Sequence, residues 1–302
     1  MFRTLFRSLF AILALVACEK DITVELPFTV PQLVVEGFIE PGLPPFVILT
    51  RTQGYFDPLD ADAVAAGFVR DALVTVDDGD GPIALDLLCT TTLTEEQRAL
   101  LAEVTGVDPN LIAQVELCIY STTNNSILGA VGRTYHLRIE QGADVLTSVS
   151  TIPPPVPLDS LWFQPRMLTA DDDSVGFLWG RIEDPAGSGN AYRWYDRRIS
   201  TRSGEDDEAV YRSGANNTFI DRYFDGGTYR FNTNGFRFPG DTVVVHFVSI
   251  GEAEYRFYRS YEANVASGGD LLGTPQNAQS NIQGGLGIWA GRGVHTDTVV
   301  CQ

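Results

Sequence analysis

Clusters of carboxylates are the groups in this sequence whose type and spacing come nearest to a chemical site. Asp77, Asp78 and Asp80 share one glycine-rich turn and offer the hard oxygen ligands that calcium takes. The turn lacks the spacing and the distal glutamate of an EF-hand loop. A solvated hairpin turn is therefore the favoured interpretation, and calcium binding is the alternative. Two further runs, Asp171–Asp173 and Glu205–Glu208, could gather a cation only if folding brought them together.

Other catalytic patterns are missing from the sequence. The three histidines, His136, His246 and His295, are scattered, and no HExxH motif or His/Cys cluster accompanies them. The sequence has no GxSxG motif, and the glycine-rich stretch 284–287 is followed by no lysine and opens no helix, unlike a phosphate loop. Paired carboxylates for sugar hydrolysis cannot be picked out among 39 acidic residues. We therefore predict no catalytic residue, no metal ligand and no cofactor, and a non-enzymatic protein.

The first eighteen residues have the three parts of an export signal. Arg3 and Arg7 precede an apolar run, Leu9–Val16, which is too short to span a bilayer. Leu15-Val16-Ala17-Cys18 resembles the lipobox of bacterial lipoproteins, in which the chain is cut before the cysteine and the cysteine is acylated. We expect a signal peptide over 1–17, lipidation of Cys18 and a tether over 18–30 that holds the protein at a membrane. The alternative is a soluble secreted protein with a chance cysteine.

The other three cysteines depend on this assignment. Cys89 and Cys118 stand at the two ends of an expected helical insertion, and export would place them in an oxidising compartment. We expect them to form a disulfide, which for a loop of this length would stabilise the fold by roughly 3 kcal/mol. Cys301 then has no partner, and we expect a free thiol on a frayed terminus, with an intermolecular bridge left open.

The charge of the chain excludes some partners. Removing residues 1–17 takes away two arginines and no acidic residue, which changes the formal net charge from −18 to −20. Such a charge disfavours nucleic acid and anionic lipid head groups. With 44% hydrophobic and 20% charged residues, the chain has ample material for a folded core.

Short runs of β-branched and aromatic residues, separated by Gly, Pro and Asp, predict a mainly β protein with two domains. Alternation in 72–76 and 135–139 indicates strands that bury one face. We predict an immunoglobulin-like β-sandwich over 31–152, whose insertion 89–118 carries two short helices. Thr94 and Gln97 have the spacing of a capping box at the start of the first of them.

Four prolines in Ile152–Pro157 mark the expected domain boundary, a stiff linker over 153–157. A second β-rich domain, also a sandwich, should follow over 158–302. Its run 243–248 is apolar on both faces apart from His246, so this strand should be covered on both sides. A helix near 252–266 should pack its tyrosines on a sheet and end at Gly268-Gly269.

Several motifs, in order along the chain, resemble the DUF4249 lipoproteins of Bacteroidota. They are CEKDI at 18–22, ELP at 25–27, LVVEGFI at 33–39, VGRTYHLRI at 131–139, the proline-rich linker with LDSL at 158–161, and NIQGGLGI at 281–288. The chain continues past the last motif with VHTDTVVCQ, which leaves the position of this tail open. The glycines of the last motif favour a structural role through close backbone approach or positive φ.

The resemblance implies an outer-membrane lipoprotein that is an accessory to a TonB-dependent receptor in nutrient capture or uptake. The acidic residues Glu19 and Asp21 after Cys18 resemble a signal for export to the cell surface, although Lys20 interrupts them. Two alternatives stay open. A cell-surface adhesion or carbohydrate-binding module would stack sugars on exposed aromatics such as Trp162, Trp194 or Tyr195, whereas a structural envelope protein would bind nothing. The sequence does not name the ligand or the transporter.

Overall fold

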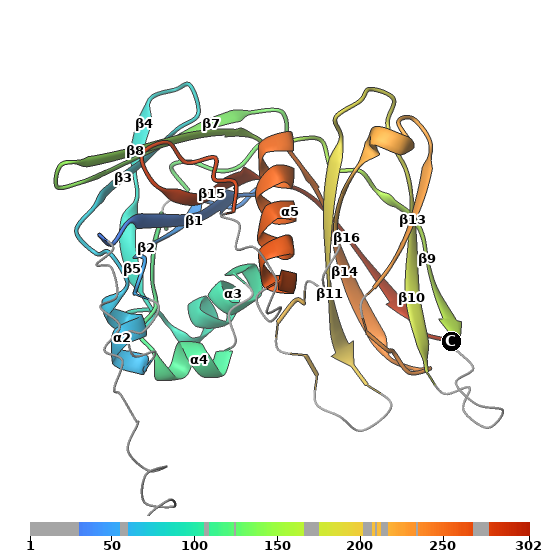
Figure 1. Ribbon diagram of the computed structural model, residues 1–302. Helices are drawn as coiled ribbons and strands as arrows, with labels where there is room; N and C mark the ends of the chain where they lie inside the picture. The colour runs from blue at the N-terminus through green and yellow to red at the C-terminus, as the bar shows by residue number, and fades with distance from the viewer. Residues whose placement is uncertain are drawn as a thin grey trace, which may run out of the picture. The chain divides into compact units, whose positions relative to one another are not determined.

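The computed structural model describes residues 30–54, 60–105, 109–123, 125–165, 175–201, 207–208, 210–212, 217–233, 235–267 and 278–302 (Figure 1). Residues Pro31–Gln302 form one compact unit. The expected signal peptide, Cys18 and nearly all of the tether lie outside the described residues. No helix within the described ranges is long and apolar enough to cross a membrane.

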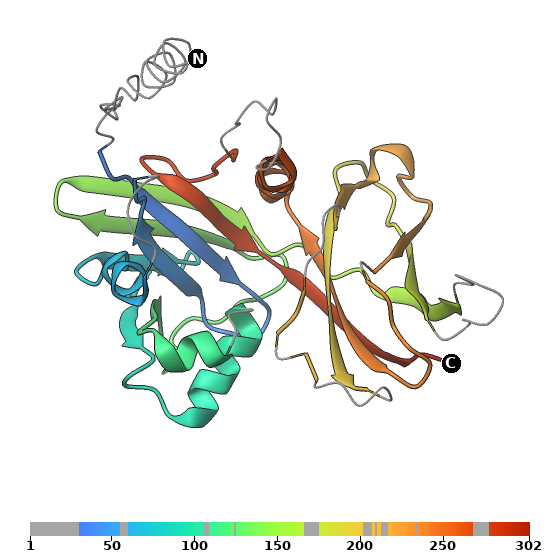
Figure 2. The same ribbon diagram turned by 60° about the horizontal axis from the view of Figure 1, so that its bottom comes forward.

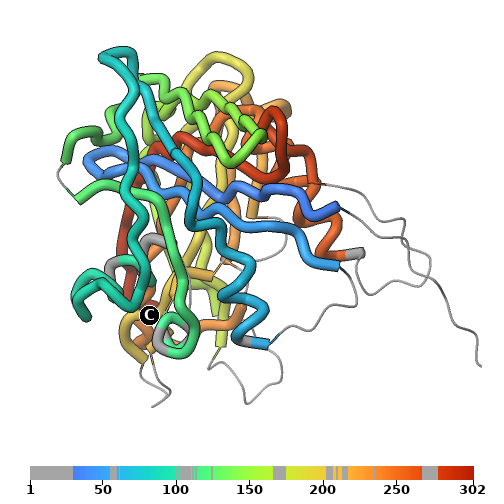
Figure 3. Tube along the Cα trace, turned by 90° about the vertical axis from the view of Figure 1, so that its left-hand side faces the viewer, coloured from blue at the N-terminus to red at the C-terminus, as the bar shows by residue number. Residues whose placement is uncertain are grey.

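Two sheets enclose the first core. One sheet has the strand order β15 (Leu286–Gly291), β1 (Leu33–Ile39), β2 (Phe46–Arg51), β6 (Cys118–Ser121) and β5 (Asp86–Cys89). The other has the order β4 (Pro82–Ala84), β3 (Leu73–Asp77), β7 (Thr134–Gln141) and β8 (Asp144–Thr151). Figure 3 shows β1 and β2 side by side in blue, paired antiparallel. The predicted alternation is confirmed, because Val74, Val76, Leu137 and Ile139 are buried while Thr75 and Arg138 point away from the core.

The predicted helical insertion is present between β5 and β6. Helix α3 (Glu95–Thr105) begins with the expected capping box: the Thr94 N–H donates to Gln97 Oε1 at 2.9 Å, and the Gln97 N–H donates to Thr94 Oγ1 at 3.2 Å. The second helix, α4 (Pro109–Gln114), follows. Cys89 and Cys118 form the expected disulfide across paired positions of β5 and β6.

A further helix, α2 (Ala61–Ala66), packs beside this insertion and was not predicted. Its N-cap is Asp60, whose carboxylate accepts the Ala63 N–H at 2.8 Å. Val64 of α2 joins the small apolar cluster that α3 and α4 form around Ala102 and Ile112. The insertion is therefore held by a disulfide at its base and by an apolar cluster at its end.

Two more sheets enclose the second core. One has the strand order β13 (Thr228–Asn232), β10 (Gly176–Glu183) and β9 (Leu158–Pro165). The other has the order β12 (Thr218–Ile220), β11 (Ala191–Ser200), β14 (Thr242–Ile250) and β16 (Gly293–Val300). A 3-10 turn, η1 (Asp221–Tyr223), follows β12. Both faces of β14 are covered, as predicted: Val243, Val245 and Phe247 lie in the core between the sheets, and Val248 packs in a separate cluster with α5 (Glu252–Ser267).

The end of the chain does not follow the predicted division at 153–157. Strand β15, assigned by the sequence to the second domain, pairs in parallel with β1 in the first sheet, and β16 then continues into the second pair of sheets. Figure 2 shows this passage as one red strand path. Only Arg292 separates the two strands. Parallel pairing of segments about 250 residues apart leaves no local pattern, which is why the sequence did not reveal it.

Helix α5 lies where the two pairs of sheets meet. Its Tyr258 is buried in an apolar cluster with Phe38 of β1, Ile288 of β15 and Val248 of β14. Tyr258 thus packs on the sheets as expected and Tyr255 is partly buried in the same cluster, whereas Tyr261 of this helix is 51% exposed. The expected cap Gly268-Gly269 lies outside the described residues.

The expectation of a frayed terminus at Cys301 is wrong. Cys301 is fully buried in the second core with a free thiol. Its N–H donates to the Asp241 carbonyl at 2.8 Å, and its own carbonyl accepts the Gly240 N–H at 2.5 Å. The tail is ordered because it is β16, which pairs with β14 along its length and whose last residues continue into this turn.

Candidate functional site

A cleft of about 410 Å³ lies between the proline-rich segment and the loop that follows β10. Pro153–Pro157 form one wall, and residues between Glu183 and Tyr192 form the other, with Ser249–Gly251 also contributing to the lining. The proline-rich segment is fixed in place, since the Val156 N–H donates to Ser249 Oγ at 3.2 Å and Val156 is buried. The volume is in the range of small-ligand clefts, which is about 300–1,000 Å³.

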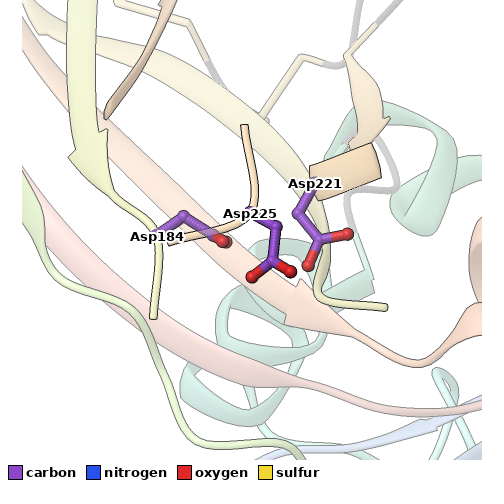
Figure 4. Close-up of side chains that lie close together, drawn as sticks. All are labelled: Asp184, Asp221 and Asp225. Atoms are coloured by element: carbon purple, nitrogen blue, oxygen red, sulfur yellow. The ribbon is translucent and has the colours of Figure 1, made fainter. Parts of the chain in front are cut away.

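Three aspartates behind this loop form the densest group of carboxylates in the described part of the chain. Asp184, Asp221 and Asp225 each place one carboxylate oxygen within 4.8 Å of the others (Figure 4). Asp184 and Asp221 are buried, whereas Asp225 is exposed. Asp184 follows β10, and the other two lie in and after η1, so pairing of β10 with β13 and of β11 with β12 brings them together.

These carboxylates already accept hydrogen bonds from the loop. Asp221 accepts the Gly189 and Asn190 N–H groups at 3.0 and 2.9 Å, and Asp225 accepts the Gly187 N–H at 2.8 Å. Asp184 accepts the Gly226 N–H at 3.0 Å. Carboxylates that accept backbone N–H groups join loop segments without any ion.

Tyr192 connects this group to the cleft wall. Its hydroxyl donates to Asp184, and burial, together with this hydrogen bond, raises the pKa of the hydroxyl. The proton therefore stays on Tyr192. Asp184, Asp221 and Asp225 are the described residues whose oxygens could hold a hard cation, but their hydrogen bonds give them a structural role that is sufficient by itself.

The acidic turn singled out in the sequence is the predicted hairpin turn between β3 and β4. Asp77 accepts the Gly79 and Gly81 N–H groups at 2.8 and 3.2 Å. The Arg133 guanidinium binds Asp78 at 3.0 Å and also contacts Asp80. An arginine thus occupies the position beside these carboxylates that a cation would take.

The other acidic runs do not form a shared site among the described residues. Asp171–Asp173 and Glu205-Asp206 lie outside them. Glu208 is buried and pairs with Arg237 at 3.1 Å, and Arg237 also contacts Asp196. Burial raises the pKa of Asp196, an effect that the neighbouring Arg237 opposes. Here too the counter-ion is a guanidinium.

The aromatic residues expected to be exposed are separated by the fold. Trp194 is 2% exposed in the second core, and Tyr195 accepts a hydrogen bond from Arg193 Nε at 2.9 Å, so neither belongs to an open stacking surface. Trp162 does lie on an outer face. It stands beside Trp179, its cross-strand partner, with ring centroids 6.2 Å apart.

Sequence reasoning missed the cleft, the three aspartates and the pairing of Trp179 with Trp162. A cleft between a proline-rich segment and a loop 30 residues later has no local pattern, and neither does an aspartate group spread over 184–225. The sequence carried a partial signal for Trp179, since alternation in GFLWGRI at 176–182 places it with Arg181 on the face opposite Leu178 and Ile182, and the structure shows that the aliphatic face is the buried one.

Comparison with known proteins assigns the chain to a family. The profile of the family described as "Domain of unknown function (DUF4249)" matches residues 19–298. The chain belongs to the DUF4249 family. No curated protein and no solved structure matches it.

The family match confirms the resemblance noted in the sequence. The structure of this DUF4249 chain also explains its last motif, NIQGGLGI at 281–288. Gly287 has φ +106, and a Cβ there would lie 1.8 Å from the Val35 carbonyl oxygen. Asn281 holds the backbone of Trp289 from both sides, accepting its N–H at 2.9 Å and donating to its carbonyl at 2.7 Å. The Trp289 indole N–H donates to the Tyr135 carbonyl at 3.1 Å inside the first core. The motif therefore anchors β15, in agreement with the structural role expected for its glycines.

Proposed function

We propose that this DUF4249 protein is a non-enzymatic lipoprotein of the bacterial outer membrane that assists a TonB-dependent receptor in nutrient capture or uptake. The observation that carries the proposal is the lipobox ending at Cys18, thirteen residues before the compact unit begins at Pro31. Thirteen residues reach at most about 45 Å. A lipid on Cys18 would hold the folded unit close to the membrane surface, within reach of a receptor in the same membrane.

The folded unit suits a role in display and contact. Its two pairs of sheets are joined by β15 and β16, and its helical insertion is closed by the Cys89–Cys118 disulfide. Helix α3 begins with exposed Glu95 and Glu96. A disulfide in this position agrees with export to an oxidising compartment. The insertion is the surface on which we place the receptor contact.

Purification of the intact lipoprotein from detergent-solubilised outer membranes of the source bacterium tests this proposal. We expect a protein tagged after the exposed Gln302 to recover an outer-membrane receptor barrel. Cys18→Ser should prevent lipidation and abolish this recovery. Lipidated protein purified from outer membranes without any barrel would contradict the accessory role.

Lipidation and exposure at the surface need separate measurements. Metabolic labelling with a palmitate analogue should mark the wild-type protein and leave Cys18→Ser unlabelled. Protease added to intact cells should degrade the wild-type protein if it faces outward. Full protection in intact cells, with degradation after lysis, would remove the basis for nutrient capture at the cell surface.

A further inference from the structure

We propose that the outer face of β9, β10 and β13 is a binding platform for a neutral glycan, with Trp162 and Trp179 as its stacking surface. This names the ligand class for the proposed capture role and rests on that role. The platform residues lie on three neighbouring strands, and the side chains that face the opposite direction fill the second core.

Strand alternation separates the two faces. On β10, Leu178 and Ile182 are fully buried, whereas Phe177, Trp179 and Arg181 between and beside them are only partly buried. Register then places these outward residues in rows across the sheet. One row contains Trp162, Trp179 and Asn232, the next contains Gln164 and Phe177, and the third contains Ser160, Arg181 and Arg230.

The two indoles form one extended apolar surface. Their planes differ by 17° and their centroids are 6.2 Å apart. Fully overlapping rings would be separated by about 3.5–4 Å, so these rings are offset and part of each face stays uncovered. Phe177 extends the aromatic area toward Phe236, which is 42% exposed, with ring centroids 5.1 Å apart.

Polar side chains border the aromatic centre. Asn232 stands next to Trp179 on β13, and Gln164, which is exposed, lies one row away on β9. An amide both donates and accepts hydrogen bonds, as a sugar hydroxyl does. The C–H face of a pyranose is apolar and slightly positive, and it complements the negative face of an indole. An aromatic centre with amides at its edge therefore matches both parts of a sugar ring.

The charges on this face favour a neutral ligand. Arg181 pairs with Asp159, and the Arg230 guanidinium lies 5.9 Å from the Trp162 ring centroid. Arg181 is thus neutralised by its own pair, and exposed Glu183 on the same face of β10 offsets the charge of Arg230, so the face as a whole has little net charge. The net charge of −18 further disfavours nucleic acid, although its bases could also stack on indoles.

Calorimetric titration of the mature lipidated protein in detergent micelles tests the platform. The probes are four neutral polysaccharides: xyloglucan, galactomannan, laminarin and dextran. We expect saturable binding to at least one of them. Trp162→Ala and Trp179→Ala should each weaken this binding by about ten-fold or more, as the loss of a base-stacking aromatic does. Tyr223→Ala, which removes an aromatic that is 92% exposed away from these rows, should leave the affinity unchanged.

A second measurement covers the case in which an alanine variant fails to fold. N-bromosuccinimide oxidises tryptophans that it can reach, so it should modify the partly buried Trp162 and Trp179 of the folded wild-type protein, and the bound polysaccharide should protect both, as read by peptide mass spectrometry. Absence of binding to all four polysaccharides would overturn the proposal, as would binding that survives in the folded double variant or oxidation that the ligand does not reduce. These measurements involve no receptor, so failure here is distinct from failure to recover a barrel.

Discussion

Removing the charge of Glu262 should strongly destabilise the junction at α5. Glu262 and Arg193 form an ion pair whose side chains are each 8% exposed, and the Arg193 guanidinium also lies 4.3 Å from the Tyr258 ring centroid. Glu262 accepts a further hydrogen bond from Thr218 at 2.8 Å. Glu262→Gln keeps the shape and leaves a buried cation without its counter-ion, which costs about 3–5 kcal/mol. For a chain of this size we expect the Tm to fall by about 6–10 °C.

The same helix provides a matched control. Glu252 and Arg256 pair at 3.0 Å with side chains that are 63% and 53% exposed. Glu252→Gln should therefore cost less than about 0.5 kcal/mol. Thermal unfolding followed by circular dichroism measures both variants. Equal Tm values for the two variants would refute the argument from burial.

A double substitution checks the cause of the loss. Arg193→Met combined with Glu262→Gln removes both buried charges, and replacing a buried pair by apolar groups is often neutral. We expect the double variant to recover part of the Tm lost in Glu262→Gln. A further loss would show that packing of the arginine, and not its uncompensated charge, dominates.

Three more predictions follow from single positions. Gly287→Ala should prevent folding, because the new Cβ would collide with Val35, whereas Gly79→Ala, at a similar φ of +101, has open space and should fold. Soluble yield and circular dichroism compare the two variants. A native thermal unfolding curve for Gly287→Ala would contradict the predicted clash. Burial and Arg197 lower the pKa of His246 to about 4. Between pH 6.5 and 4, therefore, the imidazole binds a proton in the unfolded chain but not in the folded one. The free energy of unfolding should decrease as the pH is lowered, by about 2 kcal/mol at pH 5. His246→Asn should lose that part of the pH dependence of Tm, and an unchanged dependence would be evidence against it. Burial raises the pKa of Cys301 to about 11, so a thiol reagent at pH 8 should label it only in urea; rapid labelling of native protein would disprove its burial.

Much of the fold could be predicted where the signal is local. Period-two alternation identified the strands of the first sheets, and the capping box at Thr94 and Gln97 identified the start of α3 because both partners lie within one turn. The Cys89–Cys118 pairing was predictable since both cysteines flank one excursion of the chain. In each case the interacting residues are near in sequence or share one short element.

The features that escaped prediction depend on distant contacts. Trp194 and Trp162 each lie within a strand that carries other aromatic residues, yet one fills a core and the other faces outward, since the pairing of sheets decides which face is covered. Asp184 and Asp221 meet because two different strand pairs bring their loops together. The short tail at Cys301 looked frayed because its pairing partner, β14, begins about 60 residues earlier.

The passage of the last strands through both pairs of sheets has a consequence for biosynthesis. Trp289 fills the first core, yet it is made about 250 residues after β1, the strand beside which it packs. A nascent chain that has emerged only as far as β8 (Asp144–Thr151) holds most of the first core but lacks the strand that flanks β1. It would expose both an unpaired β1 and the vacancy left by a large indole. Native packing of the first two sheets must therefore wait until β15 has been made.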